Sequence, residues 1–129
     1  MTLDLIIEHL FKQQQGDRRI DVAIAEALGW ERKTHLVLDE ATGEERTGFY
    51  WVNPFTNKPA PPPSYTSNLQ HAYELLQSLS ISSGAGFSWE PGKGGAKVYG
   101  EVSVDAATPQ LALCIAALKK VAEKTELTR

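Results

Sequence analysis

Apolar residues recur with helical spacing in four stretches of the chain. In each stretch they fall three or four positions apart, which places them on one side of an α-helix. The stretches begin after Thr2, Asp17, Ser67 and Thr108. The expected inner faces are Leu3, Ile6, Ile7, Leu10 and Phe11; Ile20, Ala23, Ile24, Ala27 and Leu28; Leu69, Ala72, Tyr73, Leu76 and Leu79; and Leu111, Cys114, Ile115, Leu118, Val121 and Ala122.

Several residues at the ends of these stretches fit helix termini. Gly29 suits the position that follows the end of a helix. Ser67 and Gln70 have the spacing of a capping box, with Ser67 as the N-cap. Pro109 follows Thr108 and can occupy the first helical position. The chain therefore predicts four helices, of which the first two form a helical hairpin.

Four other stretches favour β-strands because they are rich in aromatic and β-branched residues or alternate in polarity. They are residues 35–38, 47–52, 87–90 and 98–104. Residues 39–45 predict a hairpin connection, residues 91–95 a glycine-rich turn, and Gly100 a bulge. The order α-α-β-β-α-β-β-α predicts an α+β fold, with an antiparallel sheet of about four strands sandwiched between helices.

Residues 53–64 stand out in composition. Five of the seven prolines fall there: Pro54, Pro59, Pro61, Pro62 and Pro63. Proline fixes φ and forces the preceding residue to be extended, so residues 61–63 predict polyproline II. The segment is too short to separate two domains. We therefore expect a stiff surface connector within a single domain, residues 1–129.

Composition and charge narrow the classes of protein. The chain has 129 residues, of which 42% are hydrophobic, and a net charge of −3. This acidic balance argues against binding of long nucleic acid, which needs a basic surface. One cysteine excludes an internal disulfide framework. No apolar run approaches the roughly 18 residues of a membrane span, and the N-terminus lacks a basic leader, so we expect a soluble cytoplasmic protein with no membrane contact.

Three segments of the chain together resemble a known protein family. They are residues 20–30 (IDVAIAEALGW), residues 51–67 with Trp51-Val52-Asn53-Pro54 and Pro63-Ser64-Tyr65-Thr66-Ser67, and residues 107–119 (ATPQLALCIAALK). In order and spacing, over roughly residues 18–122, they resemble the phage ABA-sandwich domain family. The resemblance implies a sheet between helical layers and a phage or prophage protein in the bacterial cytoplasm, and it implies no reaction. Residues 2–15 lie outside it, and the long connection at residues 39–45 departs from compact members.

Candidate catalytic and metal-binding groups do not form a set. Cys114 lies in an apolar stripe, which is typical of an inert core thiol. His71 and Glu74 share a helix face without a third ligand, so we interpret His71 as solvated helix surface. The glycine-rich segment fails the Walker pattern, because Gly94 stands where Ser or Thr should follow Lys93. We expect no enzyme activity, no cofactor and no metal.

Aromatic residues around the proline connector suggest a candidate ligand site. One interpretation is that their rings pack on the prolines. The other is a pocket in which the rings stack on a planar ligand and the glycine-rich turn holds a phosphate. The ligand-binding residues would be Trp51, Asn53, Tyr65, Trp89, Lys93, Gly94 and Gly95.

Two hypotheses for function follow. The first is a non-enzymatic phage module that sequesters a host small molecule or nucleotide defence signal, by analogy with known anti-defence proteins. The alternative is a protein–protein interaction or structural accessory protein that binds a host or phage protein. Because several faces of this small chain are apolar, we also expect a homo-oligomer, most simply a dimer.

Overall fold

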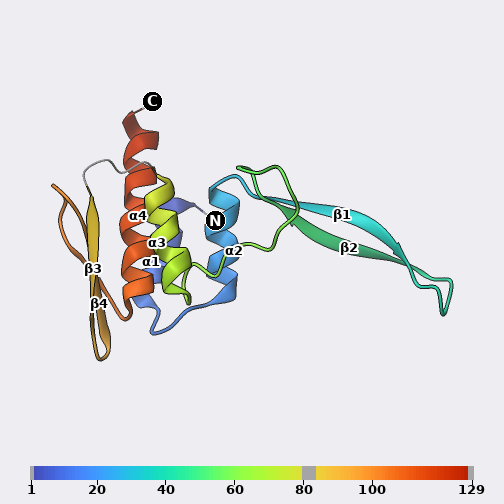
Figure 1. The fold of residues 1–129 in the computed structure, drawn as a ribbon, viewed down its shortest axis with the longest axis horizontal. Helices are drawn as coiled ribbons and strands as arrows, with labels where there is room; N and C mark the ends of the chain where they lie inside the picture. Colours follow the sequence, from blue (N-terminus) through green and yellow to red (C-terminus); the bar gives the residue numbers. More distant parts are fainter. Residues whose placement is uncertain (1, 80–83, 128–129) are drawn as a thin grey trace.

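The computed structural model describes residues 2–79 and 84–127 (Figure 1). It has an α+β fold, which confirms the class, the antiparallel pairing and the order of helices and strands expected from the sequence. The elements are α1 (Leu3–Lys12), α2 (Arg18–Ala27), β1 (Glu31–Leu38), β2 (Glu45–Val52), α3 (Leu69–Ser78), β3 (Ala85–Glu90), β4 (Lys93–Val98), β5 (Val104–Ala106) and α4 (Pro109–Leu127).

Helix α4 is the centre of the fold. Helices α1 and α3 pack on one side of it and β3, β4 and β5 on the other (Figure 1). Every residue from Leu111 to Leu118 is therefore buried, not only those on the predicted stripe. This part of α4 is apolar on all sides because helices and strands cover it on all sides. Neither α4 nor any other helix in the described ranges is both long and apolar enough to cross a membrane.

The strands are divided between two antiparallel sheets, and are not joined in the one sheet of about four strands that the sequence predicts. One sheet contains β1 and β2, and the other has the order β3-β4-β5. Residues 98–104 do not form the single strand that their alternation predicts. The chain turns at Gly100, where φ is +83°, and the amide of Glu101 donates to the carbonyl of Val98 at 2.9 Å. Val98 and Val104 therefore lie in neighbouring strands, and both are buried against α4.

The prediction of a glycine-rich turn at residues 91–95 is wrong in its extent. Because Glu90 pairs with Lys93, the turn contains two residues, Pro91 and Gly92. Gly92 has a φ of +77°, a conformation that favours glycine. Gly94 lies in β4, where a Cβ atom would come within 2.1 Å of the backbone nitrogen of Pro109. The absence of a side chain at Gly94 thus lets the sheet approach the start of α4.

Helix α3 begins one residue later than the predicted capping box. Asn68 is the N-cap, and its side chain accepts a hydrogen bond from the amide of His71 at 3.0 Å. Ser67 packs instead against Gly16, where a Cβ atom would lie 2.7 Å from the Cβ atom of Ser67. The inner face of α3 shifts accordingly, so that Leu75 is buried in place of Tyr73.

The proline connector is fixed to α2 by polar contacts. The guanidinium of Arg18 donates to the carbonyls of Pro62 and Pro63, at 2.7 and 3.1 Å. The buried carboxylate of Asp21 accepts hydrogen bonds from the amide and the hydroxyl of Thr66, both at 2.7 Å. Buried polar groups need such partners, so these contacts hold the chain between β2 and α3 in place.

Candidate functional site

The residues of the predicted ligand site fall into separate regions. Trp51 and Asn53 lie at the end of β2, whereas Trp89 lies in β3, and the helices stand between the two sheets (Figure 1). Tyr65 is only 5% exposed and belongs to the core between them. The side chain of Asn53 accepts a hydrogen bond from the amide of Phe55 at 2.8 Å and so closes a local turn.

The remaining predicted ligand residues do lie together, but not as a phosphate-binding turn. Trp89 pairs with Gly94 and is 70% exposed. Gly94 and Gly95 lie in the central strand of the sheet and are both buried. The ammonium of Lys93 lies 3.7 Å from the carboxylate of Asp105. The amides expected to hold a phosphate are therefore flanked by strands, and the neighbouring cation has an acidic partner.

The titratable groups near the connector have structural roles. Cys114 is fully buried, its thiol donates to the carbonyl of Tyr65 at 3.2 Å, and burial raises its pKa. Burial also raises the pKa of Tyr65 to about 12. His71 is not solvated surface as expected: it is half-buried, and its Nδ1 accepts a hydrogen bond from the amide of Ser64 at 2.9 Å. Among the described residues, no group of three or more His, Cys, Asp or Glu side chains is placed to hold a metal.

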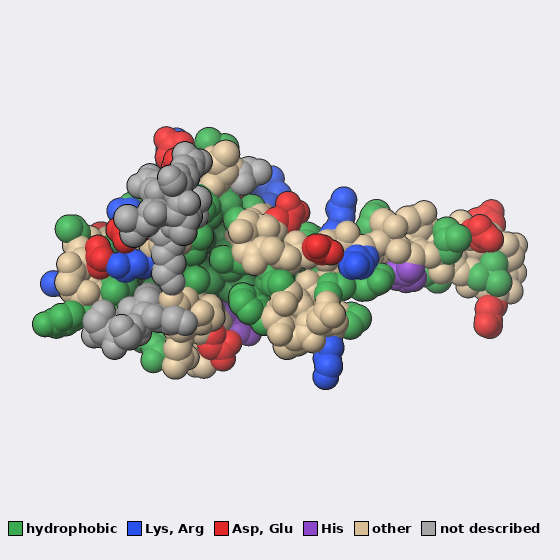
Figure 2. All heavy atoms as spheres, turned by 90° about the horizontal axis from the view of Figure 1, so that it is seen from above, with side chains coloured by type: hydrophobic (Ala, Val, Ile, Leu, Met, Phe, Trp, Pro, Cys, Tyr) green, Lys and Arg blue, Asp and Glu red, His purple; other side chains and the backbone are tan. Residues whose placement is uncertain are grey.

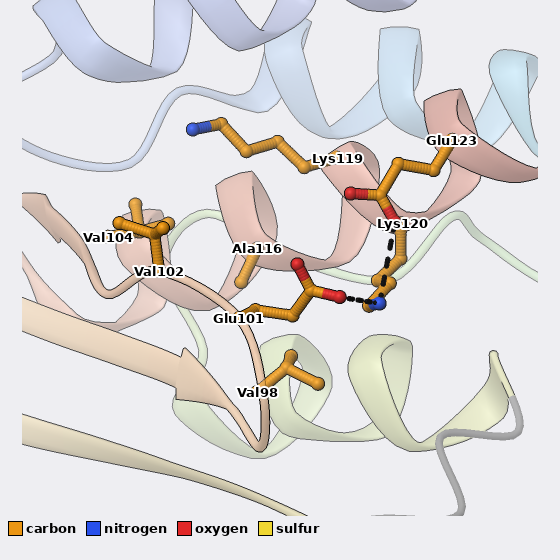
Figure 3. Close-up of a pocket in the computed structure, with 8 residues that line it drawn as sticks. All are labelled: Val98, Glu101, Val102, Val104, Ala116, Lys119, Lys120 and Glu123. Carbon is orange, nitrogen blue, oxygen red and sulfur yellow. Dashed lines mark hydrogen bonds and ion pairs between the residues drawn. The ribbon is translucent and has the colours of Figure 1, made fainter. Parts of the chain in front are cut away.

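A hollow lies between α4 and the turn that joins β4 to β5. Its volume is about 220 Å³, below the usual range of roughly 300–1,000 Å³ for small-molecule sites. Figure 3 shows Lys120 paired with Glu101 and Glu123 at its polar end, and the hydrogen bond to Glu101 raises the pKa of Lys120. Three of its four charged residues are thus paired with one another, and the ammonium of the fourth, Lys119, lies 5.4 Å from the centroid of the Phe11 ring.

The hairpin of β1 and β2, which we call the arm, is largely exposed. It projects away from the helices, with its tip at the far end of the molecule (Figure 1). All eight residues of β1 are exposed. The base of β2 is held, because Trp51 packs on the core and its carbonyl accepts a hydrogen bond from the amide of Ala60 at 3.0 Å. Strand pairing is complete along the arm, from Glu31 opposite Val52 to Leu38 opposite Glu45.

One face of the arm carries three of its four large exposed apolar side chains. Strand alternation places eight residues on it, which define the apolar arm face: Arg32, Thr34, Leu36, Leu38, Glu45, Thr47, Phe49 and Trp51. Leu36 is 71% exposed, Leu38 61% and Phe49 57%. Figure 2 shows hydrophobic side chains along the arm and acidic ones at its far end. Several large apolar side chains gathered on one surface are typical of an interaction site.

On the opposite face of the arm, which we call the polar arm face, the polar side chains have partners within the arm. The face consists of Glu31, Lys33, His35, Val37, Arg46, Gly48, Tyr50 and Val52. The ring of His35 covers Gly48, where a Cβ atom would lie 2.8 Å from it, and its centroid is 5.5 Å from that of Tyr50. The carboxylate of Glu31 lies 3.7 Å from the ammonium of Lys33. At the tip, Arg46 pairs with Asp39 at 3.2 Å.

The charges on the apolar arm face lack ionic partners. The guanidinium of Arg32 lies 4.8 Å from the centroid of the Phe49 ring, a cation–π contact, and it pairs with no carboxylate in the described part of the chain. Glu45, at the other end of the same face, likewise has no ion pair or side-chain hydrogen bond to any described residue. The two unpaired charges are of opposite sign and stand at opposite ends of the face.

The sequence alone did not single out Leu36, Leu38, Phe49, Arg32 and Glu45 as candidate residues. Alternation in two paired strands usually means that one face is buried, so the pattern gave no sign that this face is open. The available signal was the long charged connection at residues 39–45, which forms the tip of the arm.

Comparisons of the chain with family models, with curated protein sequences and with solved structures find no match. The resemblance to phage ABA-sandwich proteins therefore stays a prediction from the sequence.

Proposed function

We propose that this is a non-enzymatic interaction protein that binds another protein chain through the apolar arm face. The observation that carries the proposal is the exposure of Leu36, Leu38 and Phe49 on one side of a projecting hairpin. A two-stranded hairpin is only marginally stable in water by itself. A partner that covers this face stabilises the arm and removes about 25 cal/mol of unfavourable hydration for each Å² of apolar surface.

The charges of the arm favour a protein over a nucleic acid. Its tip carries the carboxylates of Asp39, Glu40, Glu44 and Glu45 against the single cation Arg46. Nucleic-acid binding depends on cations that neutralise phosphates, and an acidic tip opposes it. The sequestration of a nucleotide finds less support, because Trp51 and Trp89 lie in different sheets.

The proposal fits the phage accessory protein that the sequence resemblance implies, acting in the cytoplasm of a bacterial host. The connection at residues 39–45 departs from compact members of that family, and it is the tip of the arm. A function particular to this protein would then reside in the arm.

The proposal can be tested by site-specific photocrosslinking in host cells. A photoreactive phenylalanine analogue at Phe49 should give a discrete protein adduct that disappears when Leu36→Ser is added. The same analogue at Tyr99, which is 75% exposed outside the arm, is the matched control and should give no such adduct. Absence of an adduct at Phe49, or the same adduct from both positions, would contradict the proposal.

A further inference from the structure

We infer that the chain seated on the apolar arm face is a second copy of this protein, with the two arms packed face to face and pointing in opposite directions. The inference rests on the proposed function, because it takes the arm as the docking element. It adds the identity of the partner and the geometry of the contact.

The distribution of charge on the face carries this inference. Arg32 stands near the base of the arm and Glu45 at its tip, and both belong to the apolar arm face. A two-fold axis across the middle of the face brings Arg32 to the level of the partner's Glu45, and the reverse contact follows by symmetry. Each charge that lacks an ionic partner within the described chain then meets an opposite charge.

The apolar residues match in the same arrangement. Thr34 and Phe49 form one cross-strand pair, and Leu36 and Thr47 form the next pair toward the tip. In the antiparallel dimer, the first pair of one arm lies at the same position along the arms as the second pair of the other. The two-fold axis sets β1 over the partner's β1, so Phe49 of β2 lies at the level of the partner's Leu36 and one strand across from it. Packed β-layers lie about 10 Å apart, a distance that side chains of this size fill. The large apolar side chains of the two arms are thus brought to the same levels, as the opposite charges are.

A parallel arrangement of the two arms is disfavoured. It would place Arg32 at the level of the partner's Arg32, and Glu45 at the level of the partner's Glu45. Like charges in direct opposition disfavour association. The polar arm face is a poorer candidate for the contact, because Lys33 and Arg46 already have carboxylate partners there.

The size of the face predicts a reversible dimer. Eight residues from each arm are fewer than the roughly 20–30 residues a side of a standard interface, so the contact between two arms is small. We therefore expect dissociation in the micromolar range, which sedimentation equilibrium can follow on the full chain.

The decisive experiment exchanges the charges at the two ends of the face. Arg32→Glu alone and Glu45→Arg alone each put like charges opposite one another twice, so each variant should weaken dimerisation about tenfold or more. A one-to-one mixture of the two variants should restore the dimer, because both contacts then join opposite charges. Circular dichroism checks that each variant is folded.

Two controls sharpen this experiment. Lys33→Glu makes the same change of charge one residue away on the polar arm face, and it should leave the dimer unchanged. In a parallel dimer, the mixture that dimerises more strongly than either protein alone would be Arg32→Glu with wild type. That result would overturn the antiparallel geometry. Equal dimerisation of wild type and both single variants would overturn the inference.

The outcome is separable from failure of the proposed function. An in-cell adduct at Phe49 with the mass of two copies of this chain supports the inference. A wild-type protein that stays monomeric at several hundred micromolar, with a Phe49 adduct to a different protein, overturns the second copy and leaves the arm as a docking element. A monomer without any adduct specific to the arm overturns both.

Discussion

The two β-sheets of this protein are both antiparallel, but in the described part of the chain the three-stranded sheet packs along α4 whereas the arm contacts the core through Trp51 at its base. In the sheet of β3, β4 and β5, the residues that face α4 include Gly94, Ala96 and Val98, and all three are buried. In the arm, the corresponding alternate positions of β1 hold Leu36 and Leu38, and both are exposed. The difference lies in the size of the side chains and in what lies opposite them.

Small residues let a sheet approach a helix, and large ones need a partner that can receive them. Gly94 allows backbone contact with the start of α4, and Ala96 and Val98 fill the space beside it. Leu36 and Phe49 are large and apolar, yet no helix within the described residues covers them, and they are 71% and 57% exposed. In the three-stranded sheet, β4 is thus covered by α4 while Phe87 and Trp89 of β3 stay exposed, whereas in the arm the exposed apolar residues lie on both strands.

The largest effect is expected where the three-stranded sheet and the helices share their core. Ile115 is fully buried in α4. Ile115→Ala should lower the free energy of unfolding by about 2–5 kcal/mol, because it removes apolar contacts and leaves a cavity. Urea denaturation followed by circular dichroism measures the change. Unaltered stability would mean that α4 is not the centre of the core.

Gly94→Ala should break the contact between β4 and α4. The new Cβ atom would lie 2.1 Å from the nitrogen of Pro109, so the backbone must move. We expect a loss of about 1–3 kcal/mol, the usual cost of overpacking. Gly86→Ala in β3 is the matched control, because nothing lies within 4 Å of its Cβ position. Similar stability of the two variants would argue against the close approach.

High pH should weaken the packing of the connector on α4. The pKa of Tyr65 is raised from 10.0 to about 12, and that of Cys114 is also raised, both by burial. Between pH 10 and about 12 the unfolded chain loses protons that the folded chain keeps, so stability falls as pH rises. Urea midpoints at several pH values should show this fall, and Tyr65→Phe should make it shallower. An equal slope in both proteins would exclude Tyr65 as its source.

The smallest effect on stability is expected in the arm. Leu36 is 71% exposed, so Leu36→Ser should change the free energy of unfolding of the monomer by no more than about 0.5 kcal/mol. The same substitution should weaken dimerisation, because it removes apolar surface from the interface. Urea denaturation and sedimentation of one preparation give both quantities. A large loss of stability in dilute solution would show that Leu36 is part of the monomer's own core.

Much of the helical part of the fold could be predicted from the sequence, because helix ends have local chemical signals. Asp17 caps α2, and Gly29 follows its end with a φ of +101°. The error at Ser67 arose because Asn68 is an equally good N-cap and packing against Gly16 decides between them. Gly100 fits both a bulge and a turn, and its role depends on the pairing of β4 with β5.

The candidate site was less predictable for a physical reason. Aromatic residues such as Trp51, Tyr65 and Trp89 suit both a core and a pocket, and the sequence does not fix their distance in space. The alternation in β1 and β2 correctly indicated strands, but it could not indicate whether the covering layer belongs to the same chain. Arg32 and Glu45 could not be assigned to the same face before the register of the two strands was known.

Hydrogen exchange measured by mass spectrometry at several protein concentrations tests the central claim most directly. If a second copy covers the arm, exchange in the peptides of β1 and β2 should slow as concentration rises through the dissociation constant. Exchange in β3, β4 and β5 should not change, because that sheet lies outside the proposed contact. Arm exchange that is independent of concentration, or equal slowing in both sheets, would contradict the account.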